Sequence, residues 1–452
     1  MMNTKAILTI LLLTPVLTTS ATDFETATSA VTNMRVGWNL GNTLDSNSGD
    51  INNMWIEKWT SRRPADYETA WGQPITKPQL FQMFKQAGFN AIRLPVTWYP
   101  HMQAHFTLNG TAWDPANDDI GTKIQTQWIT RVHQVVDYVI NQGMYCILNI
   151  HHDTGAANTA WLVASEDHYA QQKERFEEVW RQIAEEFKDY DQHLIFEAYN
   201  EMLDPYHSWC FASFATPSNY DADVANSAYN AINSYAQSFV DVVRSTGGNN
   251  AQRNLIVSTY GACCGSGTWN THLQDPLKNM QLPADIVSDH LIFEVHSYPN
   301  IKDLNTAKSE VRQTISVLKK HLVSKGAPVI FGEWGTSTDA AYDNYRDNML
   351  AFARYFVQQA KASNIATFYW MGLSDAEHRS VPEFNQTDLK DAIIKGYYGD
   401  EGYTHITTQS TSNAPEISAC YNLQGCPISF PQQGINIIRM TDGTSRKISR
   451  HQ

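Results

Sequence analysis

Short apolar runs alternate with amphipathic helical patterns along most of the chain. Eight of the apolar runs have the length of strands, and each is almost continuously hydrophobic, as parallel strands covered on both faces are. These predicted strands are residues 34–40, 90–96, 145–151, 193–200, 254–260, 290–298, 328–334 and 366–372. Helical patterns follow the strands, and those at 77–88 and 128–143 each end on a glycine, a common signal for the end of a helix. The pattern after 254–260 is the weakest helix signal.

Eight strand–helix units in order predict an α/β fold, a (β/α)8 TIM barrel over residues 22–398. The structural alternative is an open, doubly wound sheet. The Gly-rich phosphate loop of that fold is absent from the sequence. Eight such strands also close more naturally than they remain open, so the barrel is the expected architecture.

The composition changes after the barrel. Residues 399–418 are polar and are predicted to be a linker. Residues 419–452 predict a short, β-rich C-terminal tail of two or three strands separated by glycine turns. The tail is too small to bury a substantial core by itself.

The first 21 residues have the pattern of a signal peptide. Lys5 precedes an apolar core over residues 6–17, and small residues follow at 18–21. The apolar core is too short for an ordinary membrane span, and no cysteine follows the cleavage zone, as a lipoprotein would require. We therefore expect a secreted or cell-surface bacterial protein without a transmembrane segment. Export permits disulfides, and Cys420 and Cys426 are close enough in sequence to bridge a hairpin.

The charge narrows the possible partners. The chain of 452 residues has a formal net charge of −13, which argues against nucleic acid and acidic membranes as partners. A neutral polymer would be unaffected by that charge.

Polar side chains gather where the predicted strands end, which is where a barrel enzyme carries its active site. They are Arg93, His151, His152, Asn200, Glu201, His296, Tyr298, Glu333 and Trp370. Two carboxylates on different strands, Glu201 and Glu333, suggest glycoside hydrolysis. Arg93 and Tyr298 are the natural supports for a charged Glu333. Glu201 would hold the acid proton, with the nearby negative charge of Glu333 helping it to do so.

Strand alternation separates these carboxylates from two deeper ones. Glu197 shares a face with Glu201 but lies roughly 13 Å below it at about 3.3 Å per residue. Glu197 is therefore expected to be a buried structural partner of an inward Arg or His, and Glu294 is interpreted in the same way beneath His296. The segment "NIHHD" raises a metal site as an alternative. Adjacent strand residues point to opposite faces, and no HxH or HExxH pattern occurs, so we expect no metal and no cofactor.

Tryptophans near strand ends are candidates for stacking on sugar rings. Trp370 follows the last predicted strand, and Trp161 and Trp269 lie in loops beyond strands. A flat indole can cover the apolar face of a pyranose. The other tryptophans are expected in the core.

These motifs together resemble glycoside hydrolase family 5, the cellulase family of retaining barrel enzymes. The segments "GWNLGNTLD", "GFNAIRLPVTW", "ILNIHHD", "LIFEAYNE", "FEVHSY", "VIFGEWG" and "FYWMG" occur in the family's order. The resemblance covers about residues 22–398. It implies that Glu201 is the acid/base and Glu333 the nucleophile.

The same resemblance implies the surroundings of the reacting sugar. The residues concerned are Arg93, His151, Asn200, His296, Tyr298 and Trp370, with Asn42 and Asp45 lining the cleft. The "GWNLGNTLD" opening resembles the endo-β-1,4-glucanase and xyloglucanase branch more than the mannanase branch. Met202 departs from the proline that many members carry after the Asn-Glu pair, and the loops at 204–225 and 260–270 match no pattern. Those loops leave the substrate open.

The expected function is a secreted, retaining endo-β-1,4-glucanase (cellulase) that acts on internal bonds of plant polysaccharide. The protein is expected to be a monomer. Xyloglucan, mixed-linkage glucan and mannan remain alternative substrates for the same residues. A non-catalytic polysaccharide-binding barrel is a further alternative, disfavoured because Glu201, Glu333, Arg93 and Tyr298 are all present. The C-terminal tail resembles the sorting tails of bacterial type IX secretion substrates, which implies a secretion machinery at the cell surface as a partner.

Overall fold

The computed structural model describes most of the chain. The described residues are 23–59, 63–104, 120–207, 209–210, 220–267, 270–336, 344–412, 417–422, 425, 427–428, 434–440 and 445–450. The predicted signal peptide, Trp269 and Cys426 lie outside them, as does any bridge to Cys420.

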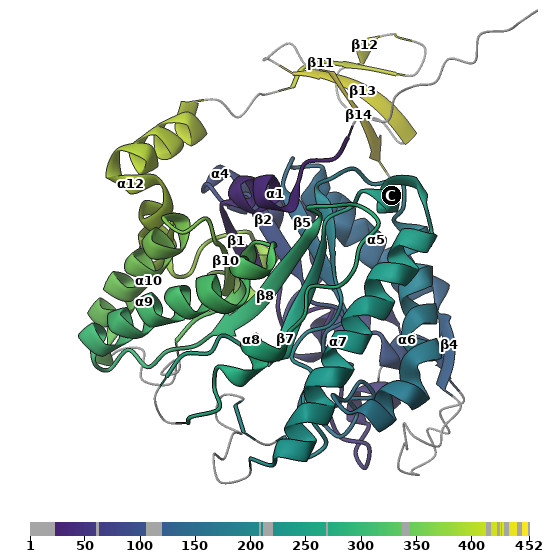
Figure 1. The fold of residues 1–452 in the computed structure, drawn as a ribbon. Coiled ribbons are helices and arrows are strands. Elements are labelled where there is room, and N and C mark those ends of the chain that lie inside the picture. Colours follow the sequence, from purple (N-terminus) through teal and green to yellow (C-terminus); the bar gives the residue numbers. More distant parts are fainter. Residues whose placement is uncertain are drawn as a thin grey trace, which may run out of the picture.

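Eight parallel strands close into a barrel, which confirms the predicted fold (Figure 1). The order around the barrel is β1-β10-β9-β8-β7-β6-β5-β2, and β1 pairs with both β2 and β10 to complete the ring. The strands are β1 (Val36–Asn39), β2 (Ala91–Leu94), β5 (Tyr145–Asn149), β6 (Leu194–Glu197), β7 (Leu255–Cys263), β8 (Leu291–Ser297), β9 (Val329–Trp334) and β10 (Ala366–Trp370). Each overlaps one predicted strand.

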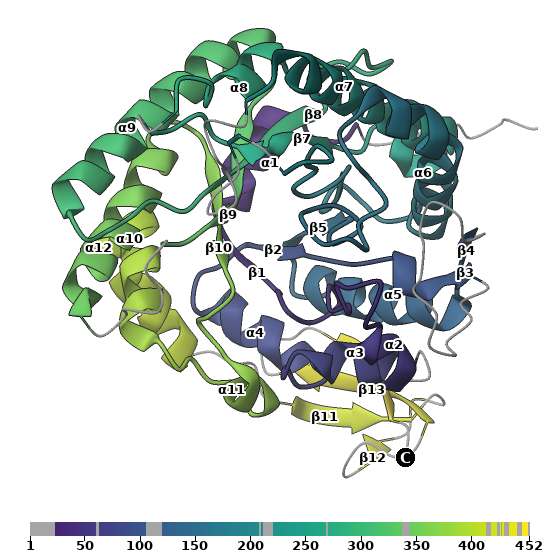
Figure 2. The same cartoon turned by 90° about the horizontal axis from the view of Figure 1, so that it is seen from below.

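Helices surround the barrel, as the view along its axis shows (Figure 2). They are α1 (Ala27–Met34), α2 (Trp55–Trp59), α3 (Pro64–Ala70), α4 (Pro78–Gln86), α5 (Thr126–Ile140), α6 (Glu166–Glu186), α7 (Ala222–Ser245), α8 (Asp275–Asn279), α9 (Leu304–His321), α10 (Arg346–Lys361), α11 (Ala376–Ser380) and α12 (Thr387–Ser412). Short 3-10 helices occupy Tyr99–His101, Gly248–Ala251 and Val323–Lys325, and a hairpin of β3 (Met102–Ala104) and β4 (Ile120–Ile124) precedes α5.

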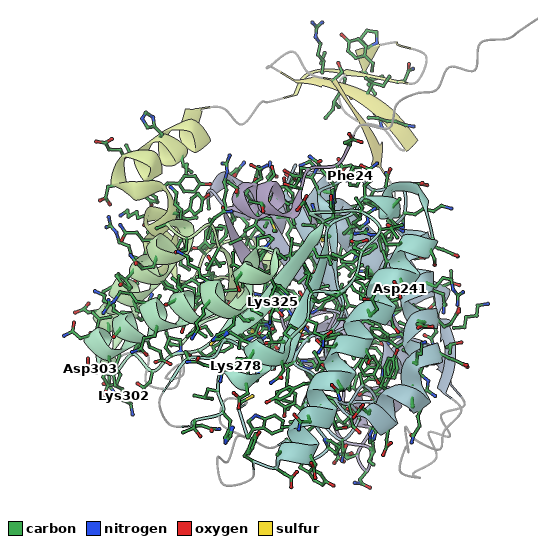
Figure 3. All side chains as sticks on the ribbon, viewed as in Figure 1. Phe24, Asp241, Lys278, Lys302, Asp303 and Lys325 are labelled. Carbon is green, nitrogen blue, oxygen red and sulfur yellow. The ribbon has the colours of Figure 1, made fainter. Side chains whose placement is uncertain are left out.

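The weak helix signal after the fifth barrel strand corresponds to α8, which has only five residues. Lys325, labelled in Figure 3, supports this short helix. Its Nζ donates a hydrogen bond to the carbonyl of Leu277 at 2.7 Å. The pattern was weak because a helix of one turn presents too few residues for a 3.6-residue period.

Two apolar layers fill the barrel and its surroundings. The larger packs the outward faces of the strands against the helices, and the smaller fills the lower barrel with residues such as Ile147, Ile195 and Ile292. Helix α1 packs its buried face against this lower layer and so closes that end of the barrel. Gly37 is required there, because a Cβ on it would lie 2.3 Å from the Phe368 ring. The open end is thus the one where the strands terminate.

The predicted polar linker is partly wrong, because residues up to Ser412 are helical. Helix α12 contains a kink at Gly399, whose φ of 75° interrupts the helix. The helix resumes because Tyr403 and Ile406 pack, half-buried, against the main core. A polar composition therefore concealed a few anchoring apolar side chains.

The C-terminal tail forms a four-stranded antiparallel sheet in the order β12-β11-β13-β14. Its strands are β11 (Ile417–Tyr421), β12 (Pro427–Ile428), β13 (Gly434–Met440) and β14 (Ser445–Arg450). Its described core consists of Cys420 and Ile438 with Ile428 against them. Figure 1 shows this sheet beyond the barrel end that α1 covers. None of the helices in the described ranges combines the length and apolarity needed for a membrane crossing.

Candidate active site

Strand register brings the polar side chains together at the open end of the barrel. Asn39 in β1 is level with Arg93 in β2, and His296 in β8 is level with Glu333 in β9. Because the strands are parallel, these levels form one ring of side chains above the apolar layer. The site therefore follows from closure of the barrel.

Arg93 is the centre of this ring and is fully buried. Its Nε and Nη2 donate to the two oxygens of Glu197, each at 2.7 Å. Nη2 also donates to Asn200 Oδ1 at 2.7 Å, and Nη1 donates to Glu333 Oε1 at 2.8 Å and to Asn39 Oδ1 at 3.0 Å. A rigid guanidinium fork can hold several carboxylates in fixed geometry, and here it ties β1, β6 and β9 together.

Glu333 and Glu201 form a close carboxylate pair. Their nearest oxygens lie within 4.8 Å of each other, with His296 between them. Glu333 Oε2 accepts a hydrogen bond from the Tyr298 hydroxyl at 2.7 Å. His296 Nδ1 lies 2.6 Å from Glu201 Oε1 and 3.5 Å from Glu333 Oε2. The side chain of Glu201 is 20% exposed, compared with 6% for Glu333, so Glu201 is the more accessible of the two.

The surroundings favour a protonated Glu201. Burial is the largest effect and raises the pKa of Glu201, and the negative charges of Glu333 and Glu294 raise it further against the lowering effect of His296. Burial also raises the pKa of Tyr298 well above its usual value, so its hydroxyl remains a donor to Glu333. The site thus holds one carboxyl that retains a proton beside one carboxylate that receives hydrogen bonds.

His151 and Trp370 form a flat wall beside this pair. Their rings stack with centroids 5.7 Å apart and an interplanar angle of 7°. Burial, together with the positive charge of Arg93 and the neighbouring His152, lowers the pKa of His151 well below its usual value. His151 is therefore a neutral hydrogen-bonding group, with Nε2 3.9 Å from Glu333 Oε1.

Asn42 and Asp45 shape the loop after β1. Asn42 has a φ of 56°, a left-handed conformation that asparagine tolerates. Asp45 is buried and accepts the backbone N–H groups of Asn42 and Thr43 at 3.0 and 2.6 Å. Burial raises the pKa of Asp45 to about 6 despite those bonds. Asp45 therefore fixes the loop.

Among the described residues, two groups of side chains have the composition of a metal site. They are Asp45 with His151 and His152, and Glu201 with His296 and Glu333. In the first, the Asp45 oxygens already bond to backbone N–H groups, and His152 Nε2 is 3.7 Å from Asp45. In the second, His296 and Tyr298 occupy the carboxylate oxygens. Neither group presents a set of free ligands.

The stacking role predicted for Trp161 does not fit its position. The residue is 3% exposed, and its indole N–H donates to Asp153 Oδ1 at 2.7 Å. Asp153 also accepts the backbone N–H groups of Trp98 and Tyr99. Trp161 is therefore a core residue, because a carboxylate eight positions earlier draws its ring inward.

Three residues near the site were not identified from the sequence. Asn39 bonds Arg93, and Asn149 Nδ2 contacts both Glu197 Oε1 at 2.9 Å and His151 Nδ1 at 3.1 Å. Their position at strand ends was the available signal. The half-exposed ring of Trp71 lies 5.5 Å from that of His152. No strand or helix pattern marked Trp71, which follows the short helix α3.

The loop after β6 is fastened to strand β7. Trp209 stacks on Tyr260 with centroids 4.5 Å apart, and the Sγ atoms of Cys210 and Cys263 lie 2.6 Å apart. The Tyr260 hydroxyl donates to Asp204. These contacts hold the loop after β6, which contains Glu201, against the end of β7.

Comparison with known proteins matches this chain to cellulases. The sequence profile "Cellulase (glycosyl hydrolase family 5)" matches residues 54–375. Endoglucanase B of Neocallimastix patriciarum is 32% identical over 402 residues, covering 84% of this chain and 74% of the relative.

Solved structures of family 5 enzymes are also similar to this chain. A GH5-4 broad specificity endoglucanase from an uncultured bacterium is 51% identical with a TM-score of 0.76, covering 85% of this chain and 98% of that one. A family 5 enzyme of Prevotella bryantii, solved with a xyloglucan tetradecasaccharide, is 38% identical with a TM-score of 0.68, covering 83% and 99%.

Proposed function

Because the chain belongs to glycosyl hydrolase family 5 and is an endoglucanase-like glycoside hydrolase, we propose that it cleaves internal β-1,4-glucan bonds with retention of configuration. The observation that carries the proposal is the separation of the two carboxyl groups, whose nearest oxygens lie within 4.8 Å. Retaining enzymes place these groups about 5–5.5 Å apart, whereas inverting enzymes leave room for a water at about 6.5–9.5 Å.

In the first step, Glu333 attacks the anomeric carbon while Glu201 gives its proton to the departing glycosidic oxygen. The bond from the sugar to that oxygen breaks, and a glycosyl–Glu333 ester forms. In the second step, Glu201 takes a proton from water, the water attacks the same carbon, and Glu333 is released as a carboxylate. Arg93 and Tyr298 donate hydrogen bonds to the two oxygens of Glu333 and hold it in position for the first attack.

The remaining residues position the sugar. The amide of Asn200, held by Arg93, would bond the 2-hydroxyl, and His151 would offer a neutral hydrogen-bonding nitrogen. Trp370 would provide a stacking surface on one side and Trp71 on another, next to His152. Asn42 would line the cleft. Trp269 remains a proposed stacking residue outside the described ranges.

Xyloglucan is the second candidate substrate. The Prevotella bryantii relative was solved with a xyloglucan oligosaccharide, which supports a cleft able to admit a branched glucan. We also propose export through the signal peptide, with the C-terminal sheet as a sorting element for the cell surface. The signal-peptide pattern over the first 21 residues supports this location.

The proposal is tested with Glu333→Gln, which removes the nucleophile but keeps the size of the side chain. We expect kcat on carboxymethylcellulose to fall by about 1,000-fold or more, equivalent to about 4 kcal/mol of transition-state stabilisation, while polymer binding persists. Glu68→Gln is the matched control, because Glu68 is a buried carboxylate bound to Arg131 away from the strand ends. Retained activity in Glu333→Gln would overturn the proposal. Parallel rates on xyloglucan, mixed-linkage glucan and mannan identify the preferred polymer.

A further inference from the structure

A third carboxylate lies beneath the catalytic pair and has no part in the mechanism above. Glu294 in β8 is fully buried and points to the same side as His296 two residues later. Its Oε1 contacts His296 Nε2 as an ion pair, and its Oε2 accepts a hydrogen bond from the Ser258 hydroxyl. The opposite ring nitrogen, Nδ1, contacts Glu201. One imidazole therefore bridges Glu294 and Glu201.

The fold provides space for this carboxylate. A Cβ on Gly332, in the neighbouring strand β9, would lie 2.1 Å from Glu294 Oε1. Any larger residue at 332 would displace the carboxylate. Neither Glu294 Oε1 nor His296 Nε2 has a hydrogen bond to another described group, so each depends on the other for compensation of its burial.

Protonation follows from these contacts. Burial disfavours the imidazolium, but the charges of Glu294 and Glu333 and the contact with Glu201 outweigh it and raise the pKa of His296 well above its usual value. Burial likewise raises the pKa of Glu294, but the opposite charge of His296 outweighs it and lowers that pKa. His296 is thus a buried cation paired with a buried anion.

We infer that Glu294 is a positioning residue, which cancels the charge of the His296 imidazolium so that Glu201 is oriented without losing its proton. A lone imidazolium beside Glu201 would favour the carboxylate form and weaken the acid. A neutral imidazole could instead turn an acceptor nitrogen towards Glu201 and draw the acid proton away from the substrate. The ion pair avoids both outcomes, because Nδ1–H can donate to Oε1 while the other oxygen of Glu201 carries the proton.

Other charged and titratable groups also face this ion pair. From the neighbouring strands and their ends they are Arg93, His151, Glu197, Tyr199, Glu201, Tyr298 and Glu333. Arg93 is already engaged by Glu197 and Glu333. Glu294 is accordingly the carboxylate in contact with Nε2.

The inference rests on the proposed function, and Glu294→Gln tests it. Glu333 and Glu201 still favour a protonated His296 in this variant, so the imidazolium is no longer cancelled and lowers the pKa of Glu201. The basic limb of kcat/KM on polymer is therefore expected to move down by about one pH unit. An aryl cellobioside with a dinitrophenolate leaving group needs no protonation, and its kcat/KM should change less than about threefold. Glu68→Gln, a buried carboxylate elsewhere, should leave the pH profile in place.

A structural role alone would lower both rates together without moving the limb, and that result would overturn the inference. Should the variant fail to fold, selective ¹⁵N labelling of histidine in the unaltered protein gives an independent answer. The ring of His296 is expected to be an imidazolium at pH 7. A neutral His296 ring at that pH would also overturn the inference. An active Glu333→Gln would instead refute the proposed function, so the two failures are distinguishable.

Discussion

Glu197 offers a test of whether the buried ion cluster supports both stability and catalysis. It is fully buried and receives two hydrogen bonds from Arg93 at 2.7 Å and one from Asn149 at 2.9 Å. Glu197→Gln leaves one oxygen as an acceptor but turns an amide N–H₂ towards the guanidinium. One charge-assisted bond is lost and Arg93 loses a counter-charge.

The magnitude follows from these losses. A hydrogen bond to a charged group contributes about 1.5–3 kcal/mol, and breaking a buried ion pair costs about 3–5 kcal/mol. Because the glutamine keeps part of the contact, we expect a loss of about 3 kcal/mol in the free energy of unfolding, measured by urea denaturation. Arg93 would also shift towards Glu333 and disturb the position of that carboxylate. We therefore expect kcat/KM to fall about 100-fold, which corresponds to about 2.7 kcal/mol.

Glu68→Gln is again the informative control. Glu68 is fully buried and receives two bonds from Arg131, at 2.9 and 2.8 Å, so its loss should cost comparable stability. Glu68 lies outside the ring of strand-end side chains, so the kcat/KM of the Glu68→Gln variant should match that of the unaltered enzyme. If Glu197→Gln lost stability but kept its kcat/KM, the coupling through Arg93 would be refuted.

Three further predictions concern two tryptophans and the metal alternative. Trp370→Ala should lower kcat/KM about tenfold, mainly through KM, since a stacking surface contributes about 0.5–1.5 kcal/mol. Trp161→Ala should instead lower the free energy of unfolding by about 3–5 kcal/mol with KM unchanged, because the ring is in the core. A raised KM with unchanged stability would contradict the core position of Trp161. Dialysis against a chelator should leave activity intact, measured on carboxymethylcellulose, and a loss restored by added metal would revive the metal alternative at Asp45 or His296.

The barrel was predictable because its strands are buried on both faces and give continuous apolar runs. The side chains at their ends could then be assigned to one edge by alternation alone, which brought Arg93, Glu201 and Glu333 together. Alternation gives the face of a side chain but not its partner. The sequence therefore predicted an inward Arg or His for Glu197 without selecting Arg93.

Loops and polar helices were less predictable for a physical reason. Trp161 is buried through one bond to Asp153, and Gly399 interrupts α12 without ending it. Each outcome depends on one or two particular contacts: the bond to Asp153 for Trp161, and the packing of Tyr403 and Ile406 on the core for α12. A local pattern averages over many positions and cannot register one such contact.

The contacts of Arg93 determine when, during folding, the enzyme becomes active. Its partners Asn39, Glu197, Asn200 and Glu333 are 54, 104, 107 and 240 residues away in the chain. Contacts of such long sequence separation form late, because the intervening chain must be ordered first. A partly synthesised or partly folded chain therefore has no working site. Recovery of hydrolysis after dilution from denaturant should follow the slowest step of barrel assembly.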